Sequence, residues 1–431
     1  MNKADPKRFC MLSYSAYELD NRVRRYAEAL SEQGHRVHAI CLNRTLDQPC
    51  DITINGVHVH RLQARLGKNE KGKVAFLLPI IKFWCRSFGW LTREHFRHRF
   101  SMIHVHNIPD FLVFAAIIPR IFGAKIIHDI HDLVPEFFAS KFQSASSSWL
   151  VRTLRVIERL SASFAHHVII SNDLWRRTIV NRSVRQEKCS VFINYVDPNV
   201  FYPRQREKQR GERKLILYPG GLQRHQGVDI AIRAFARVSP NFPEAEFHIY
   251  GEGDQKSSLI ALVDELKITD RIQFFEPLPV LEISERMGQA DLALVPKRAE
   301  SFGGTAFSTK ILEFMALGIP LIISRTPIDE FYFNDQVVRF FESGNDEELA
   351  FIIRDMLTNK SHRTKLAENA LEFARSRSWA IRSHDYLRIV DELLALGEAK
   401  SFCEDDQTCC QESVTVKSDQ RPSRNLSCPG S

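Results

Sequence analysis

Short apolar runs alternate with amphipathic helical patterns along the first half of the chain. Four of these runs have the length and composition of buried strands, namely Arg36–Leu42, Met102–His106, Lys125–Asp129 and His167–Ser171. Helical patterns stand between them, for example at Arg22–Gln33, where Gly34 provides a stop signal. Strands that alternate with helices over short links predict a parallel sheet with helices on both faces.

The alternation stops at residues 203–214, a strongly charged stretch without apolar periodicity, and then restarts. Helices are predicted at Val228–Val238 and Gln255–Leu266. The strands predicted in this second half are Leu215–Pro219, Glu246–Tyr250, Ile272–Phe275, Leu292–Pro296 and Pro320–Ser324. The chain is therefore expected to be an α/β protein of two doubly wound domains.

The predicted organisation is a first domain over residues 1–203, a charged linker over 204–214 and a second domain over 215–378. A C-terminal helix is expected over residues 379–400. Residues 401–431 contain few large apolar side chains and no periodicity, so they are predicted to form a disordered tail.

Length and composition exclude several classes of protein. The 431 residues are too many for a typical single domain. With 44% hydrophobic and 26% charged residues, the chain is not collagen-like, wholly disordered or disulfide-stapled. The nine cysteines lack zinc-ligand spacing, so a zinc site is not indicated. An odd cysteine count without a secretory signal indicates a cytoplasmic protein with reduced thiols.

Charge is unevenly shared between the two halves. Residues 1–200 contain 29 Lys and Arg against 17 Asp and Glu, net +12, whereas residues 201–431 contain 30 against 35, net −5. A basic half suits nucleic acid, anionic lipid or a phosphorylated substrate, and a merely solvated surface is the alternative.

The longest apolar stretch, Val74–Leu91, is interrupted by Pro79, Lys82 and Arg86, which makes it a poor membrane-spanning candidate. Its aromatic and cationic side chains suit a helix that lies in a membrane interface and is attracted to anionic lipid. The alternative is a core helix with a basic edge.

Glycine-rich turns follow the first two predicted strands of the second domain. Gly220 and Gly221 follow the first strand, and Gly251 and Gly253 follow the second. Such turns allow the backbone to approach a phosphate, although simple tight turns have the same composition. Because neither turn is a G-x-G-x-x-G motif, dinucleotide binding is not indicated.

The most specific stretch is residues 296–320. Gly303 and Gly304 precede a predicted helix that carries Lys310 and Glu313 three residues apart, hence on one face. The helix N-terminus and Lys310 are suited to hold a diphosphate, and Glu313 to accept hydrogen bonds from ribose hydroxyls. The alternative is a surface ion pair. The apolar neighbours of Glu313 disfavour that alternative, because a buried carboxylate needs a partner.

In the first domain, Asp129 and His131 lie at the end of a strand, and alternation places them on the same side. From the residues alone, a capping aspartate and a structural histidine are the alternative. His104 and His106 lie around another strand end and are expected to be structural.

The order and spacing of these motifs resemble those of the bacterial retaining glycosyltransferases of the GT-B fold, over about residues 20–400. The matching motifs are Asn21–Leu30, His128–Asp132, Asn194–Pro203, His225–Gly227, Gly251–Gly253, Pro279–Ile283 and Lys310–Glu313. The resemblance implies two Rossmann-like domains with a central cleft and a C-terminal helix that returns to the first domain. It also implies sugar transfer from a nucleotide-diphosphate donor with retention at the anomeric carbon, without metal or other cofactor.

The resemblance assigns candidate roles to residues. His131, Asp129 and Thr305 are the catalytic candidates, with His131 beside the transferring sugar, where its backbone or imidazole steadies an oxocarbenium-like centre. Asn21, Arg22 and Arg24 are acceptor-side candidates. The donor-binding candidates are Gly220, Gly221, Arg224, Gln226, Gly251, Gly253, Lys297, Arg298, Gly304, Lys310 and Glu313.

The chain departs from the family pattern at three positions. The family has two glutamates eight positions apart, and here Thr305 and Glu313 take those positions. Thr305 is expected to cap the helix N-terminus instead. The arginine and lysine of the first phosphate loop are replaced by Gly221 and Gln226. Nearby candidates to supply the missing charge are Arg224, Lys297, Arg298 and Lys310.

The expected function is sugar transfer to a lipid-linked oligosaccharide or a growing surface polysaccharide. The expected location is the cytoplasm, with peripheral binding to the inner face of the cytoplasmic membrane. Nucleic acid is not an expected partner, because no nucleic-acid-binding module is recognisable. Two alternatives stay open: a catalytically quiet scaffold, suggested by Thr305, Gly221 and Gln226, and a nucleotide-sugar epimerase on the same fold.

Overall fold

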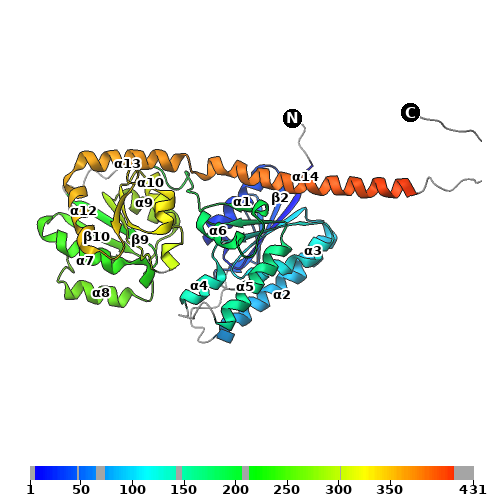
Figure 1. Cartoon of the computed structure of the whole chain (residues 1–431), viewed down its shortest axis with the longest axis horizontal. Coiled ribbons are helices and arrows are strands. Elements are labelled where there is room, and N and C mark those ends of the chain that lie inside the picture. Colours follow the sequence, from blue (N-terminus) through cyan, green and yellow to red (C-terminus); the bar gives the residue numbers. More distant parts are fainter. Residues whose placement is uncertain are drawn as a thin grey trace, which may run out of the picture.

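The computed structural model describes residues 5–45, 48–64, 73–141, 148–205, 213–300 and 302–411. Two α/β domains lie side by side, and the long C-terminal helix α14 (Trp379–Gln411) crosses from the second domain onto the first (Figure 1).

The first domain is built on an eight-stranded sheet of order β3-β4-β2-β1-β5-β6-β7-β8, parallel except for the β3–β4 pair. Its strands are β1 Arg8–Ser13, β2 Arg36–Asn43, β3 Asp51–Ile54, β4 Val57–Ala64, β5 Met102–His106, β6 Lys125–Ile130, β7 His167–Ile170 and β8 Cys189–Val191. Its α-helices are α1 Asn21–Glu32, α2 Lys73–Arg97, α3 Ile117–Ile121, α4 Val134–Lys141, α5 Trp149–Phe164 and α6 Asp173–Val180.

Alternation along the central strand β1 explains how the sheet is covered. Phe9 and Met11 pack on one face with side chains of α1 and α14. Cys10 and Leu12 pack on the other face with side chains of α2 and α5. Because successive side chains of a strand point to opposite faces, every sheet residue in register with Phe9 or Met11 faces α1 and α14.

The second domain has a six-stranded parallel sheet of order β11-β10-β9-β12-β13-β14. Its strands are β9 Lys214–Pro219, β10 Ala245–Tyr250, β11 Ile272–Phe275, β12 Leu292–Val295, β13 Leu321–Arg325 and β14 Arg339–Glu342. Its helices are α7 Val228–Val238, α8 Lys256–Glu265, α9 Val280–Gly288, α10 Thr309–Ala316, α11 Pro327–Tyr332, α12 Asp346–Thr358 and α13 Lys360–Arg375. The central strand β9 ends at the Gly220 turn, at the carboxyl edge where parallel sheets bind ligands.

The structure confirms the predicted two doubly wound domains, and most predicted strands differ from the observed ones by one residue at an end. The sequence interpretation missed the central strand β1 and the β3–β4 hairpin. Asn55 and Gly56, both with positive φ, form the turn of that hairpin. It also missed the short strands β8 and β14.

The predicted tail, linker and interface helix can be compared with the structure only in part. The tail predicted to be disordered from residue 401 is helical to Gln411, because α14 continues through it. Most of the charged linker, residues 206–212, and the end of the tail, residues 412–431, lie outside the described residues. The helix predicted around 74–91 is the longer α2, and no described helix combines the length and apolarity that a membrane crossing requires.

The aromatic side chains of α2 do not form the outward surface that the interface prediction assumed. Phe83 is fully buried, and Trp84, Phe88 and Trp90 pack partly buried against the same core. Phe76 is also one of the aromatic residues of Val74–Leu91, but the side chains of residues 73–76 are outside the described part. The prediction was wrong about these aromatics, because the helix turns its aromatic face toward the sheet.

Candidate active site between the domains

Two cavities meet at α10. The cleft cavity, of about 390 Å³, is lined by the start of α1, by His131 and by residues 194–201 on one side, and by Val280, Thr309 and Glu313 on the other. The turn cavity, of about 420 Å³, is lined by the Gly220 and Gly251 turns, Tyr250, Leu278, Lys310 and again Thr309 and Glu313. Because Thr309 and Glu313 of α10 line both cavities, the turn cavity and the cleft cavity adjoin each other at this helix.

The glycines of the turn cavity are required by the packing of the two turns. A Cβ atom on Gly251 would lie 1.9 Å from Gly220 O, and one on Gly253 would lie 2.4 Å from Leu222 C. Gly220 N donates to Tyr250 O at 2.8 Å, which joins the turns. Gly220, Gly221 and Gly251 line the cavity as predicted, whereas the role of Gly253 is to let the second turn approach the first.

Lys310 carries the positive charge of the turn cavity. Its ammonium donates to Gln226 Oε1 at 3.3 Å and lies 5.3 Å from the centroid of the Tyr218 ring. Burial lowers the pKa of Lys310 to about 8, although Glu313 opposes the shift. Burial likewise raises the pKa of Glu313, against the opposing effects of Thr309, Lys310 and Arg25.

The N-terminus of α10 is open toward both cavities. Ser308 occupies the N-cap position without making a side-chain cap hydrogen bond, and its Oγ has no hydrogen-bond partner among the described residues. The first-turn N–H groups next to Thr309 and Lys310 are therefore suited to receive an anion.

Thr305 does not have its predicted capping role, because α10 begins four residues later, at Thr309. Its side chain lies outside the linings of both cavities. Its carbonyl accepts a hydrogen bond from Asn172 Nδ2 at 3.2 Å, so the loop before α10 touches the first domain. A second interdomain contact joins Tyr332 OH to Asp173 Oδ2 at 2.7 Å. A catalytic role for Thr305 has no geometric support.

Three basic residues proposed to replace the missing phosphate-loop charge lie elsewhere. Lys297 is buried and donates to Asp329 Oδ2 at 2.8 Å and to Ala306 O. Arg298 pairs with Asp229, and together with Arg224 it lines a separate cavity between α7 and α8. Of the four candidates, Lys310 alone lines the turn cavity.

Two further donor-binding candidates, Gln226 and Gly304, contact other residues of the protein and do not line the turn cavity. Gln226 reaches Lys310 through its side chain and orients the ammonium. A Cβ on Gly304 would lie 2.0 Å from Ala299 O, so this glycine closes its own loop rather than approaching a ligand.

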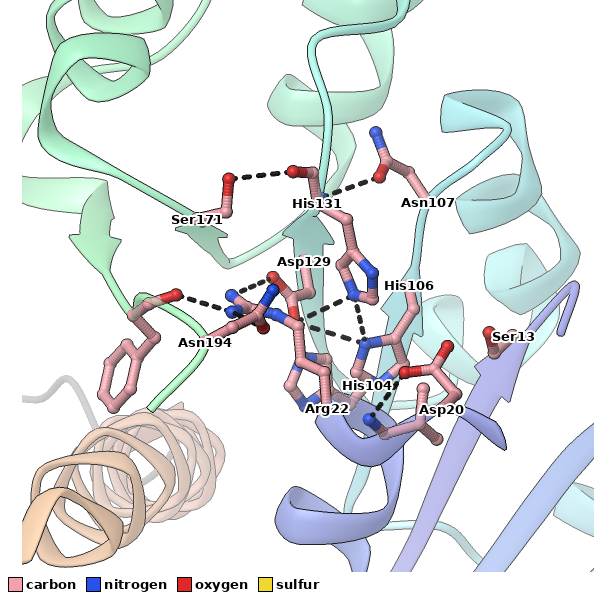
Figure 2. A network of polar contacts seen from close by, with 12 residues as sticks. Ser13, Asp20, Arg22, His104, His106, Asn107, Asp129, His131, Ser171 and Asn194 are labelled. Atoms are coloured by element: carbon pink, nitrogen blue, oxygen red, sulfur yellow. Dashed lines mark hydrogen bonds and ion pairs between the residues drawn. The ribbon is translucent and has the colours of Figure 1, made fainter. Parts of the chain in front are cut away.

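On the first-domain side, His131 extends from the end of β6 into the cleft cavity with its side chain 22% exposed (Figure 2). Asp129, two residues earlier, is fully buried. Arg22 from α1 donates to both carboxylate oxygens of Asp129 at 2.8 Å. Burial raises the pKa of Asp129, but Arg22, His131 and His106 outweigh this effect and hold it well below its usual value.

The acceptor-side candidates do not share one environment. Asn21 is exposed and lines the cleft cavity, as does Arg24, which pairs with Glu28 on the same helix. Arg22 is only 4% exposed and faces Asp129. The sequence interpretation overlooked Arg25, which lines the cleft cavity, donates to Tyr195 O and is close enough to Glu313 to affect its pKa. Its position one turn after Asn21 is the signal that would have identified it.

His104, His106 and Asp129 are a group with metal-ligand chemistry, since their ligand atoms all lie within 4.8 Å of one another. The guanidinium of Arg22, however, already bonds both oxygens of Asp129. A cation at the same carboxylate would be repelled by Arg22, so this donor set does not fit a metal.

Comparison with known proteins assigns both halves of the chain. The family model described as "Glycosyl transferase 4-like domain" matches residues 19–194, and the model described as "Glycosyl transferases group 1" matches residues 203–373. The first match covers the first sheet apart from β1, the second covers the whole second sheet, and together they span most of the chain.

Individual relatives are distant. A D-inositol 3-phosphate glycosyltransferase of Thermobifida fusca is 23% identical over 82% of this chain and 83% of its own. The O-antigen biosynthesis glycosyltransferase WclY of Escherichia coli is 29% identical over 63% of this chain and 73% of its own. The structure of Anabaena HepE in complex with UDP and glucose has a TM-score of 0.68 at 17% identity, covering 89% of this chain and 99% of its own. With both domain models matched and two Rossmann-like domains facing each other across a cleft, the chain belongs to the group 1 glycosyltransferases of the GT-B fold.

Proposed function

We propose that this glycosyltransferase binds a nucleotide-diphosphate sugar in the turn cavity and transfers its sugar, with retention, to an acceptor that enters the cleft cavity. The observation that carries the proposal is that Thr309 and Glu313 line both cavities. The diphosphate end of a donor held by Lys310 thus lies on one side of α10, and the sugar reaches toward His131 on the other.

The donor is held mainly by groups of α10. The open N-terminus of α10 and the Lys310 ammonium neutralise the diphosphate, and the Glu313 carboxylate accepts hydrogen bonds from sugar or ribose hydroxyls. The solved relative that contains UDP and glucose supports a donor of this class.

The mechanism follows from the charges that face the donor. A metal is not required, because Lys310 and the helix N-terminus supply the positive charge that the leaving diphosphate needs. Retention follows from the family resemblance, and it needs no protein base because the acceptor hydroxyl passes its proton to the leaving phosphate. His131 borders the cavity where the sugar is transferred.

The acceptor is proposed to be a lipid-linked or polysaccharide saccharide at a membrane surface, in line with the O-antigen pathway named for one relative. Support comes from helices α2, α3 and α5, which cover one face of the first sheet. Their exposed large apolar side chains, called here the α2–α5 surface, are Leu77, Leu78, Ile81, Phe96, Ile117, Ile121, Trp149, Val156 and Leu160. Exposed cations on α2 and α5 are Lys82, Arg86, Arg93, Arg97, Arg152 and Arg159. Apolar and basic groups together suit an anionic bilayer.

The experiment is a thermal-shift panel with UDP, GDP and ADP. At about 100 times its Kd, a bound nucleotide stabilises the native protein by about 2.7 kcal/mol, and one of the three is expected to raise Tm. Glu313→Ala and Lys310→Met are expected to lose this shift. Lys188→Met is the control, because this lysine donates to the carbonyls of Ala162 and Ser163 far from α10.

If no nucleotide raises Tm, the proposal is wrong and the scaffold alternative gains support. If one does, the matching nucleotide sugar is incubated with the protein, and the anomeric configuration of the released sugar is followed by NMR. Release in the donor's own configuration supports retention, and inversion contradicts it.

A further inference from the structure

Strand register brings three buried polar side chains onto the α1–α14 face of the first sheet. His106 and Asp129 are register partners on the neighbouring strands β5 and β6, and His104 lies two residues before His106. All three are fully buried. Arg22 of α1 covers Asp129, and Tyr386 of α14 lies 3.1 Å from His104 Nδ1. Arg22, Asp129, His106 and His131 belong to one network of polar contacts (Figure 2).

Four of the five N–H groups of Arg22 donate to other groups of the protein. Nε and Nη2 bond the two oxygens of Asp129, and Nη1 donates to Phe192 O at 2.6 Å and to Asn194 Oδ1 at 3.1 Å. A bidentate pair of this kind fixes the orientation of the carboxylate plane as well as its charge. Arg22 therefore determines where Asp129 Oδ2 points, which is toward His106 Nδ1 at 3.2 Å.

The surroundings of His106 determine which ring nitrogen is protonated. Burial lowers the pKa of His106 although Asp129 opposes it, so the ring is neutral and carries one proton. Its Nε2 is buried and has no hydrogen-bond partner in the part of the chain that the structure describes. Its Nδ1 faces the carboxylate oxygen Asp129 Oδ2, which can only accept, and lies 3.1 Å from His131 Nε2. We assign the proton to Nδ1, since a buried N–H without an acceptor is costly.

This assignment determines what His131 presents to the cleft. Its Nε2 faces the N–H of His106 and acts as an acceptor, which leaves Nδ1 as the ring nitrogen that carries a proton. Its backbone N–H is bonded to Asn107 Oδ1 at 2.8 Å, which leaves the imidazole as the hydrogen-bond donor of this residue. An N–H donor matches an oxygen of a bound substrate rather than a cationic carbon.

We propose that Arg22 and His106 are positioning residues that act through Asp129 and hold His131 in the Nδ1-protonated tautomer, so that it donates a hydrogen bond to a substrate oxygen. Arg22 was predicted to contact the acceptor, and its proposed role is now to position His131 through Asp129. The tautomer follows from the protein alone. Its use in sugar transfer rests on the proposed function.

The test is long-range ¹H–¹⁵N NMR of protein labelled at its histidine rings, which distinguishes the two neutral tautomers. The His131 signal is identified by its loss in His131→Gln. Wild-type His131 is expected to be protonated on Nδ1. His106→Asn retains an N–H near the position of Nδ1 and should preserve that tautomer. His106→Leu removes the N–H, and His131 should then donate from Nε2 to Asp129 Oδ2, now 3.4 Å away.

A matched pair of arginine variants separates positioning from general stability. Arg22→Lys loses the bidentate bond, and we expect a mixture of His131 tautomers and about a tenfold loss of kcat for donor hydrolysis, with KM and the nucleotide thermal shift unchanged. Arg182→Lys is the control, because Arg182 makes a comparable bidentate bond to Glu136 at 2.6 and 2.9 Å in the same domain. It should lower stability and leave the His131 spectrum unaltered.

An Nε2-protonated His131 in the wild type, or an unchanged tautomer in His106→Leu, would overturn the proposal. So would equal spectral changes in Arg22→Lys and Arg182→Lys. If no nucleotide binds but the tautomers behave as stated, the proposed function fails and the structural inference stands.

Discussion

Lys310 holds its charge in an environment that opposes it. The half-buried ammonium has Glu313 as its nearest counter-charge and Lys297 as a repelling neighbour, and its pKa falls to about 8. A bound diphosphate would bring two or more negative charges to the ammonium and raise that pKa again. Proton uptake and donor binding are therefore linked at this side chain.

Donor affinity is expected to depend on pH in a specific direction. Below pH 8 the free protein already carries the Lys310 charge, so Kd for the nucleotide diphosphate is constant. Above pH 8 the free lysine loses its proton, and Kd should rise by up to about tenfold per pH unit until the pKa of the bound state is reached. Calorimetric titrations between pH 6.5 and 9.5, at about half-unit steps, measure this.

Lys310→Arg provides the control for that titration, because a guanidinium remains charged over the whole range. Its affinity should be lower than that of wild type at pH 7 but nearly independent of pH. A wild-type Kd that stays flat up to pH 9.5 would show that another group neutralises the diphosphate.

Helix ends in this fold are shaped by glycines that serve two different needs. Gly34, after α1, and Gly227, before α7, both have positive φ, of 85° and 66°. A Cβ on Gly34 meets nothing within 4 Å, whereas one on Gly227 would lie 1.9 Å from Pro296 O. Gly34 is thus needed for conformation alone. Gly227 also allows the strand end at Pro296 to approach α7.

Alanine substitutions at these two glycines should separate the two needs. Gly34→Ala is expected to cost about 1–2 kcal/mol, the penalty of a left-handed conformation for a residue with a side chain. Gly227→Ala should cost clearly more, because a backbone carbonyl must also move. Urea unfolding followed by circular dichroism measures both losses relative to wild type. Similar losses for the two variants would contradict the close approach at Pro296.

The distribution of exposed apolar side chains over the protein is asymmetric. Most of those in the first domain belong to the α2–α5 surface, where exposed cations accompany them. The second domain has isolated examples such as Phe351, which is 66% exposed. Isolated apolar side chains are normal, but a group of them with basic neighbours indicates a surface partner.

Vesicle binding should therefore require the first domain. The double variant Leu78→Asp, Trp149→Asp places two charges at side chains that are 61% and 77% exposed. It should reduce co-sedimentation with vesicles containing phosphatidylglycerol by at least about tenfold, since each change removes apolar contact and adds repulsion. Phe351→Asp is the control and should bind as wild type does. Equal loss in both, or none in either, contradicts the proposed orientation on the membrane.

Much of this architecture was determined by local sequence patterns. Apolar runs and the helical periodicity between them predicted two doubly wound domains, since these patterns record which face of each element is buried. The Gly220 and Gly251 turns and the Lys310–Glu313 pair were also found in this way, because a strand end, a glycine turn and a helix start are contiguous in the chain. Five of the predicted donor-binding residues line the turn cavity, because the carboxyl ends of parallel strands meet at one edge of the sheet: Gly220, Gly221, Gly251, Lys310 and Glu313.

Only the tertiary structure decided which polar side chains are bonded to other residues of the protein and are therefore not available to a ligand. Arg22 and Asp129 are 107 positions apart, and nothing local to either residue indicates that they pair. Lys297 appeared as suitable for phosphate as Lys310, yet Asp329 neutralises it in the interior. The aromatic side chains of α2 were predicted to face a membrane, but in the structure they pack against the first sheet. In each case the partner comes from a distant strand or helix, so only the register and packing of the folded chain determine the pairing.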